Sequence, residues 1–156
     1  IPDLEGALSE CARLLPPGGR LVLTAPCHRF TECLLGWRIL QKIGSSRLAD
    51  RYDRWFNTRS QHHHLLSIAD WQTLLEAHGF RVTDAHYYFS PRAHAAFEVL
   101  HYLGSPTLVF RSTTGRWLPW RNPITYRVAN RWLAPLASPA GVEEGAYLFL
   151  TAERQE

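Results

Sequence analysis

The first strong pattern along the chain is an apolar stripe at helical spacing in its first fifteen residues. Its members recur every three or four positions and are Leu4, Ala7, Leu8, Cys11, Leu14 and Leu15. Asp3 can cap the start and the Pro-Pro-Gly-Gly at 16–19 ends the stripe, so we predict a helix over about 4–15. The run RLVLTAP at 20–26 is almost continuously apolar, which is typical of a strand covered on both faces in a parallel sheet.

The middle of the chain has one weakly marked and one strongly marked helix. A partly helical stretch at about 30–43 is followed by a polar segment. Ser67 and Asp70 then stand at the positions of a capping box, and Gly79 stops the helix that they begin. The β-branched and aromatic residues of FRVTDAHYYF predict a second strand over 80–89.

The remaining residues predict two more helices and a closing strand. A proline at the first helical position marks a helix over about 91–103 and another over about 123–134. The segment GAYLFLTAER predicts a strand at 145–153, and this order of helices and strands indicates an α/β fold. A strand at 20–26 covered on both faces needs a parallel neighbour on each side, which three strands cannot supply. We therefore expect half of the sheet to lie upstream.

Composition adds three constraints. Hydrophobic residues make up 46% of the chain and charged residues 20%, as in a globular protein. Three cysteines without a CxxC pair suit reduced thiols, and neither a signal peptide nor an apolar run of about 18 residues is present. We therefore expect a cytoplasmic protein. The chain lacks methionine and opens on Ile1, so we expect either a processed mature protein or an incomplete fragment, and the half-sheet favours the fragment.

Three segments together resemble a known family. Residues 1–28 contain an IPD loop, a helix ending in Arg-Leu-Leu, a Pro-Gly-Gly turn and a strand that closes on Ala-Pro. With 62–89 and 143–154 they are similar to a class I S-adenosylmethionine-dependent methyltransferase of the small-molecule type. The resemblance implies that residues 1–156 form the C-terminal half of one Rossmann-like methyltransferase domain, in which the last strand is antiparallel.

The resemblance also implies S-adenosylmethionine as the cofactor. Ile1, Pro2 and Asp3 match the family's loop and are the implied cofactor-binding residues. The family's glycine-rich cofactor loop is absent, because no G-x-G occurs in the 156 residues, and so is the acidic residue expected after the family's second strand. We therefore predict that this chain alone binds S-adenosylmethionine weakly and is inactive.

The candidate catalytic residues begin at the end of the first strand. Ligands of open parallel sheets bind beyond the carboxyl ends of the strands. His28 and Arg29 come just after the predicted strand at 20–26 and should therefore lie at such an end. Histidine is the commonest general base, so His28 is a catalytic candidate and Arg29 a substrate-binding one; the alternative for His28 is a polar loop residue. The double glycine at 18–19 precedes a strand rather than a helix, the wrong order for a phosphate loop.

Two further groups of histidines carry possible chemistry. Adjacent residues of an extended chain point to opposite sides, so His62 and His64 share a face that His63 opposes. They suit substrate contact, acid–base work or a structural role better than a metal site, because no carboxylate or cysteine stands at metal-ligand spacing. His94, Glu98 and His101 fall on one helical face and suit either a metal or, as we expect, solvated surface.

The segment 91–143 is the least ordinary part of the chain and is predicted to be a helical cap insertion. From Val99 to Val142 it has five arginines, interleaved aromatics and no carboxylate. Trp117, Trp120 and Arg121 are its candidate substrate-binding residues. The alternatives are a surface on anionic lipid, a packed helical subdomain, or a nucleic-acid patch, which a net charge of +3 disfavours.

The sequence therefore predicts methyl transfer to a small-molecule or lipid-like acceptor. The alternative is a non-catalytic module of methyltransferase type that binds a membrane surface or a protein partner through the arginine- and tryptophan-rich insertion. We expect no metal and no nucleic acid as a partner.

Overall fold

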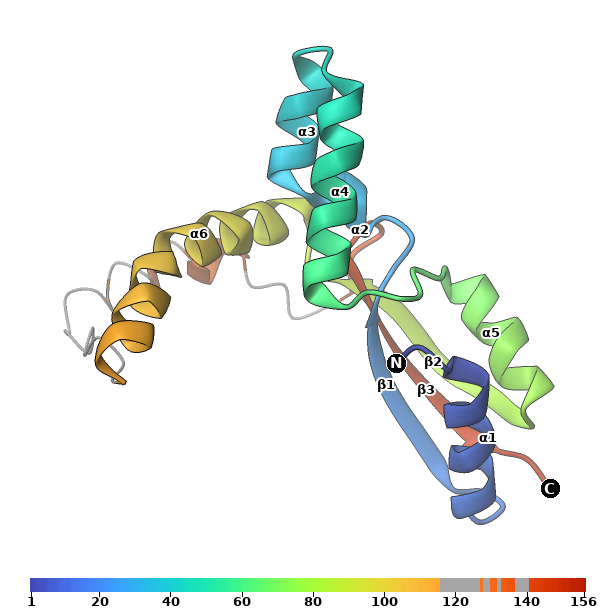
Figure 1. Ribbon diagram of the computed structural model, residues 1–156. Coiled ribbons are helices and arrows are strands. Elements are labelled where there is room, and N and C mark those ends of the chain that lie inside the picture. The colour runs from blue at the N-terminus through green and yellow to red at the C-terminus, as the bar shows by residue number, and fades with distance from the viewer. Residues whose placement is uncertain (116–126, 128–129, 132, 137–140) are drawn as a thin grey trace.

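The computed structural model describes residues 1–115, 127, 130–131, 133–136 and 141–156. Three strands, β1 (Arg20–Pro26), β2 (Phe80–Tyr88) and β3 (Tyr147–Arg154), form one sheet in the order β1-β3-β2. The described helices are α1 (Leu4–Leu14), α2 (Phe30–Cys33), α3 (Leu35–Lys42), α4 (Ser46–Ser60), α5 (Ile68–Ala77), α6 (Pro91–Thr114) and the short 3-10 helix η1 (Ala134–Leu136). Figure 1 shows α3 and α4 as a hairpin that projects from one end of the sheet.

The central strand β3 is antiparallel to both of its neighbours, so β1 and β2 run parallel to each other. The three predicted strands are confirmed, with the last antiparallel, and their bounds agree within two residues. The chain is thus of the mixed α/β class that its pattern predicts.

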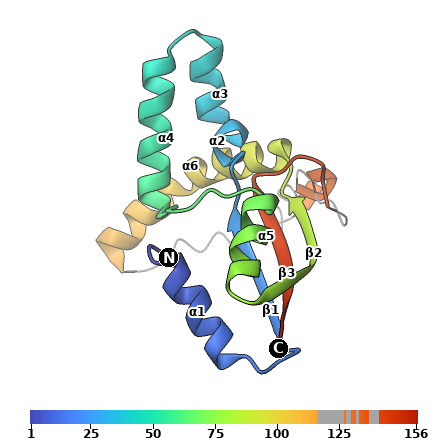
Figure 2. The ribbon, with the colours of Figure 1, turned by 90° about the vertical axis from the view of Figure 1, so that its right-hand side faces the viewer.

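One face of the sheet is covered by α1 and α5, as Figure 2 shows. Alternate residues of β3 point to this face and are fully buried, as expected for side chains that follow the period of a strand. We call this core the apolar layer; its buried members are Leu8, Cys27, Trp71, Leu75, Phe80, Leu148, Leu150 and Ala152.

The prediction that the strand at 20–26 is covered on both faces is wrong for the described part of the chain. β1 lies at an edge of the sheet, and its residues alternate between exposed and half-buried. Val22 is 53% exposed, because the described helices that cover β1 lie on its opposite face, against Leu21, Leu23 and Ala25. A continuous apolar run therefore did not distinguish a strand inside a sheet from one at its edge.

Local signals place the ends of two helices correctly. The Asp3 carboxylate accepts a hydrogen bond from the Gly6 amide at 2.9 Å, which caps α1. Ser67 and Asp70 form the predicted capping box of α5. Gly79 follows α5 with a φ of +76°, a left-handed conformation that favours glycine. These ends depend on contacts within a few residues, and such contacts can be read from sequence.

Two helices differ from the prediction. The polar segment expected after residue 43 is the fifteen-residue helix α4. The helix expected to end near Leu103 continues to Thr114 as α6, past Gly104, although glycine costs a helix interior about 1 kcal/mol. The cap insertion predicted at 91–143 begins with α6 and stays a prediction. Trp117, Trp120 and Arg121 lie outside the described residues.

Candidate active site

The carboxyl ends of β1 and β2 meet at one edge of the sheet, because the two strands are parallel. Cys27, the residue after β1, donates its amide to Ala146 and its thiol to the Gly145 carbonyl, both at 3.0 Å. The next amide, that of His28, donates to the Leu66 carbonyl at 3.3 Å. The Cys27 bonds tie the end of β1 to the residues before β3, and the His28 bond holds the segment 61–66, with its three histidines, beside the end of β1.

His28 and Arg29 occupy this edge as predicted, in different environments. His28 is exposed, and its ring meets Tyr87 edge-on with 6.1 Å between the centroids. Arg29 donates to Glu144 at 2.7 Å, with Glu32 at 3.5 Å, and the Glu144 carboxylate raises the pKa of Arg29. That pairing ties the end of β1 to the segment before β3. A role of Arg29 in binding an acceptor stays a prediction.

His62 is half-buried and fixed by two contacts. Its Nδ1 lies 3.0 Å from Asn57 Oδ1 of α4, and its ring meets Phe30 edge-on with 4.5 Å between the centroids. Burial lowers the pKa of His62, and the neighbouring His63 adds to the effect. The neutral ring is therefore favoured, which is the form that can accept a proton.

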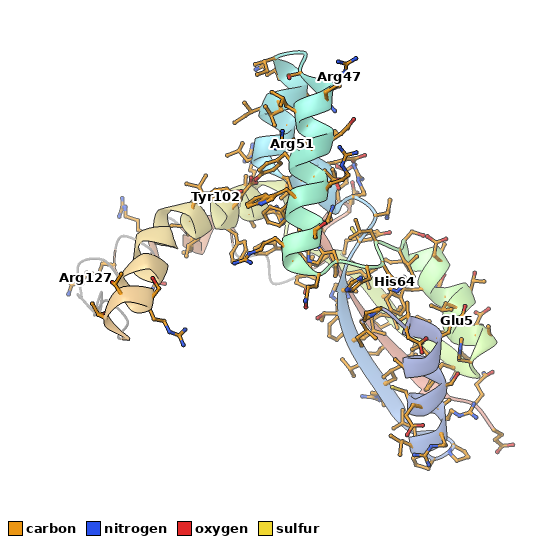
Figure 3. All side chains as sticks on the ribbon, in the orientation of Figure 1. Glu5, Arg47, Arg51, His64, Tyr102 and Arg127 are labelled. Carbon is orange, nitrogen blue, oxygen red and sulfur yellow. The ribbon has the colours of Figure 1, made fainter. Side chains whose placement is uncertain are left out.

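His64 lies against the start of the chain (Figure 3). Its Nε2 is 3.0 Å from the Pro2 carbonyl oxygen, which can only accept, so Nε2 carries the proton and donates. His64 therefore ties the segment 61–66 to residues 1–3. His62 and His64 are half-buried while His63 is exposed, in keeping with the predicted alternation.

A cavity of about 330 Å³ opens at this edge, between α1, β1 and the segment 61–66. Its lining is mainly apolar, with the three histidines at one end: Ile1, Leu4, Ala7, Leu8, Cys11, Leu21, Leu23, Thr24, Ala25, Pro26, Gln61, His62, His63, His64 and Trp71. An apolar pocket with a few polar groups at one side is the usual form of a small-molecule site.

The three implied cofactor residues lie beside this cavity but do not suffice to hold S-adenosylmethionine. Ile1 lines the cavity, Pro2 is bound to His64 and the Asp3 carboxylate is used as a helix cap. No acidic residue stands among the described lining residues to bind the ribose hydroxyls or the ammonium group of the cofactor. The assignment of Ile1, Pro2 and Asp3 stays a prediction.

The expectation of a solvated stripe at residues 94–101 is wrong for its two described side chains. His94 is 1% exposed and Glu98 is 3% exposed, because α2 and the α3–α4 hairpin pack on this face of α6. The Glu98 carboxylate accepts from the amides of Leu35 and Gly36, at 2.5 and 3.0 Å, and from the Tyr52 hydroxyl. It thereby caps α3, since the first amides of a helix have no partner within it.

We call this second packed region the edge junction. It joins α2, α3, α4 and α6 above the sheet edge, and its members are Phe30, Cys33, Leu34, Trp37, Tyr52, Phe56, Phe89, His94, Glu98 and Tyr147. Phe30 is its centre, with the rings of His62, His94 and Tyr147 all edge-on to it. Sequence reasoning missed this region, although Leu48, Tyr52 and Phe56 of α4 do recur at helical spacing.

The buried thiols of Cys27 and Cys33 are poorly suited to nucleophilic chemistry. Burial raises the pKa of the Cys27 thiol, and it raises the pKa of Cys33 to about 11. Both therefore stay protonated near neutral pH, and the thiolate is the reactive form. Within the described residues, His, Cys, Asp and Glu side chains do not gather in threes in a way that could hold a metal ion. No described helix is both long and apolar enough to cross a membrane.

Comparisons with known proteins place the chain in a family. A family model described as a methyltransferase domain matches residues 1–85, more than half of the 156. A search of curated proteins finds no significant match. A crystal structure from Galdieria sulphuraria, provisionally assigned as a sarcosine dimethylglycine methyltransferase, is 17% identical with a TM-score of 0.44. That likeness covers 99% of this chain but 49% of the other, so the chain spans about half its length, and at this score it carries no argument about activity.

The matched residues contain α1, β1 and the histidines at the sheet edge. They also include all of the first and most of the second of the three segments whose resemblance to methyltransferases was noted in the sequence. The chain therefore belongs to the methyltransferase-domain family, among the class I S-adenosylmethionine-dependent methyltransferases.

Proposed function

We propose that this chain forms the acceptor side of a methyltransferase domain and serves methyl transfer to a small-molecule or lipid-like acceptor. The observation that carries the proposal is the cavity at the carboxyl edge of β1, where His62, His63 and His64 lie at one end of an apolar pocket. The family supplies the reaction type. The apolar lining favours an acceptor with a substantial hydrocarbon part.

The chain's own residues contribute alignment and proton transfer. Methyl transfer needs the acceptor atom held in line with the methyl group, so the apolar wall would position the acceptor. A neutral histidine beside an acceptor hydroxyl or amine can take its proton, and His62 has both the position and the protonation state. S-adenosylmethionine would supply the methyl group, and we propose that residues outside these 156 bind most of it.

Calorimetry tests this division of labour. The 156-residue chain should bind S-adenosylmethionine no tighter than about millimolar, whereas the product of the gene's complete open reading frame should bind at micromolar concentration. That product should also transfer a tritiated methyl group to lipid or small-molecule extracts. Micromolar binding by the isolated chain would contradict the division of labour. An inactive full product that binds no cofactor would contradict the proposed activity itself.

A surface of the α3–α4 hairpin supports a second function, contact with an anionic membrane. Ile39, Ile43 and Leu48 are all more than half exposed near its tip, and Ile43 is 68% exposed. Around them stand Arg38, Lys42, Arg47 and Arg51, which form no ion pair within the described part of the chain. Figure 3 shows Arg47 near the tip and Arg51 farther along α4. Apolar residues among cations suit the headgroup region of anionic lipid.

Vesicle co-sedimentation tests the membrane contact. The chain should bind vesicles of phosphatidylcholine with phosphatidylglycerol and should not bind phosphatidylcholine alone. Reversing two charges with Arg47→Glu and Arg51→Glu should weaken binding about tenfold or more, since each cation near the surface contributes about 1 kcal/mol. Arg20→Glu, at an exposed arginine at the far end of β1, is the control for the single change Arg47→Glu. Equal weakening by the control would show a general charge effect and overturn the assignment to the hairpin.

A further inference from the structure

A chain of hydrogen bonds leads from α2 and α4 to the ring of His62. Asp53 Oδ1 accepts from the Thr31 hydroxyl and from Asn57 Nδ2, both at 2.6 Å. The other side of the Asn57 amide, its Oδ1, lies 3.0 Å from His62 Nδ1. Asp53 and Asn57 stand one turn apart on α4, so the helix itself sets their spacing.

The chemistry of these groups determines where each proton lies. A carboxylate can only accept, so the amino side of the Asn57 amide must face Asp53 and its oxygen must face His62. That oxygen can also only accept, so Nδ1 of His62 carries a hydrogen and donates it. In the neutral ring the lone pair then lies on Nε2.

The remaining contacts leave Nε2 available. His62 Nε2 makes no hydrogen bond to the described residues, and the ring lines the cavity at the sheet edge. Phe30 lies edge-on to the ring at an interplanar angle of 84°, which restricts its rotation. One bond at Nδ1 and one aromatic contact therefore fix both the proton position and the plane of the ring.

We propose that Thr31, Asp53 and Asn57 are positioning residues that hold His62 in its Nδ1-protonated form, so that Nε2 takes a proton from an O–H or N–H group of the acceptor. This rests on the proposed methyl transfer and narrows it to a protic acceptor, a hydroxyl or an amine that still carries hydrogen. In the proton step the O–H or N–H bond breaks, its electron pair stays on the acceptor atom, and the proton forms a bond with the Nε2 lone pair. The imidazolium later releases that proton to solvent.

Nitrogen NMR tests the positioning without any methyl transfer. The chain is labelled with ¹⁵N-histidine, two-bond proton–nitrogen correlations are recorded at pH 8, and His62→Gln identifies the resonances of His62. We expect a protonated Nδ1 and an unprotonated Nε2. In Asp53→Asn the Asn57 amide is free to turn over and offer its amino group to Nδ1, so the Nε2-protonated form should become populated.

Asp50→Asn is the matched control, because Asp50 is an exposed acid three residues before Asp53 on the same helix. It should leave the His62 signals unchanged. Asn57→Leu provides a second variant if Asp53→Asn alters folding. It removes the oxygen that accepts from Nδ1, so the Nε2-protonated form of His62 should again become populated. A wild-type ring protonated at Nε2, or signals unmoved by both variants, would overturn the proposal.

Activity of the complete open-reading-frame product separates this proposal from the proposed function. His62→Gln should lower kcat about 100-fold, and Asp53→Asn should lower kcat with little change in KM and shift the acidic limb of the pH profile. If the full-length protein transfers no methyl group but its His62 is protonated at Nδ1, the positioning stands and the proposed methyl transfer is contradicted. Methyl transfer with unaltered kcat in both His62→Gln and Asp53→Asn would support the proposed function and contradict the role of His62 as the proton acceptor.

Discussion

The apolar layer and the edge junction pack in different ways. In the apolar layer, α1 and α5 lie on the sheet through mainly aliphatic side chains, with Leu148 and Leu150 fully buried at its centre. In the edge junction, aromatic rings meet edge-on around Phe30, and Glu98 is buried with three hydrogen-bond donors. One region is held by contacts that have little directional preference, the other by contacts with defined geometry.

That difference explains where the candidate chemistry lies. Aliphatic packing tolerates small shifts of side chains of similar volume, whereas a hydrogen bond weakens steeply when its geometry is lost. A ring that must present one particular nitrogen needs the second kind of support. His62 has it through a bond to Asn57 and an edge-on contact with Phe30, the centre of the edge junction. The apolar layer supplies stability, and the edge junction supplies position.

The largest expected effect tests the apolar layer. Leu148→Ala should lower the free energy of unfolding by about 3 kcal/mol, because it removes buried methyl groups and leaves a cavity under α1 and α5. Urea denaturation measures it, with Val22→Ala on the exposed face of β1 as the control. A loss below about 1 kcal/mol would mean that this layer is loosely packed.

The next effect tests the edge junction. Glu98→Gln keeps the shape of the side chain but replaces one acceptor oxygen with an amino group, which faces a donor of α3 or Tyr52. The mismatch should cost about 2 kcal/mol of the free energy of unfolding, measured in the same way. Glu76→Gln, at an exposed position of α5, should change it by less than about 0.5 kcal/mol. If both changes are equally mild, the buried carboxylate does not hold the hairpin.

A smaller loss of stability is expected at the capping box of α5, and its size shows whether the cap or the packing on the sheet decides that this helix forms. Ser67→Ala removes the side-chain oxygen that accepts from the Asp70 amide and should cost about 1 kcal/mol in thermal unfolding. A loss as large as that of Leu148→Ala would show that the cap, and not packing, decides whether α5 forms.

The smallest effect at neutral pH comes from His94. Burial lowers the pKa of His94, while Glu98 and a bond to the Cys33 backbone oppose that shift and His62 adds to it. Because the unfolded chain binds the proton more readily, this contribution to stability is present above about pH 6.5 and is lost as the pH falls through the folded pKa. His94→Gln should therefore flatten the fall in the free energy of unfolding below pH 6.5. An unchanged slope would contradict the assignment to His94; the separate contribution of His62 has the same sign.

Features that depend on contacts between residues close in the chain were predicted correctly, whereas features that depend on contacts between distant elements were missed. The cap at Asp3, the capping box at Ser67 and the turn at Gly79 depend on neighbours within a few residues, and all were predicted correctly. The helix α4 was missed because its apolar positions are diluted by arginine and aspartate, and its formation depends on packing against α3. His94 and Glu98 were expected on a solvated face, since nothing in their own helix indicates what covers it.

The sequence by itself determined the α/β class, the three strands, the family and the place of His28 after the carboxyl end of β1. Those features follow from periodicity, local capping and segment resemblance, which a linear chain displays directly. Only the tertiary structure decided that β1 lies at the edge of the described sheet, that Glu98 caps α3 from a distant helix, and that Thr31 of α2 donates to Asp53 of α4. These pairings join residues far apart in the chain or on separate elements, and no local pattern encodes which side chain will face another once the elements pack.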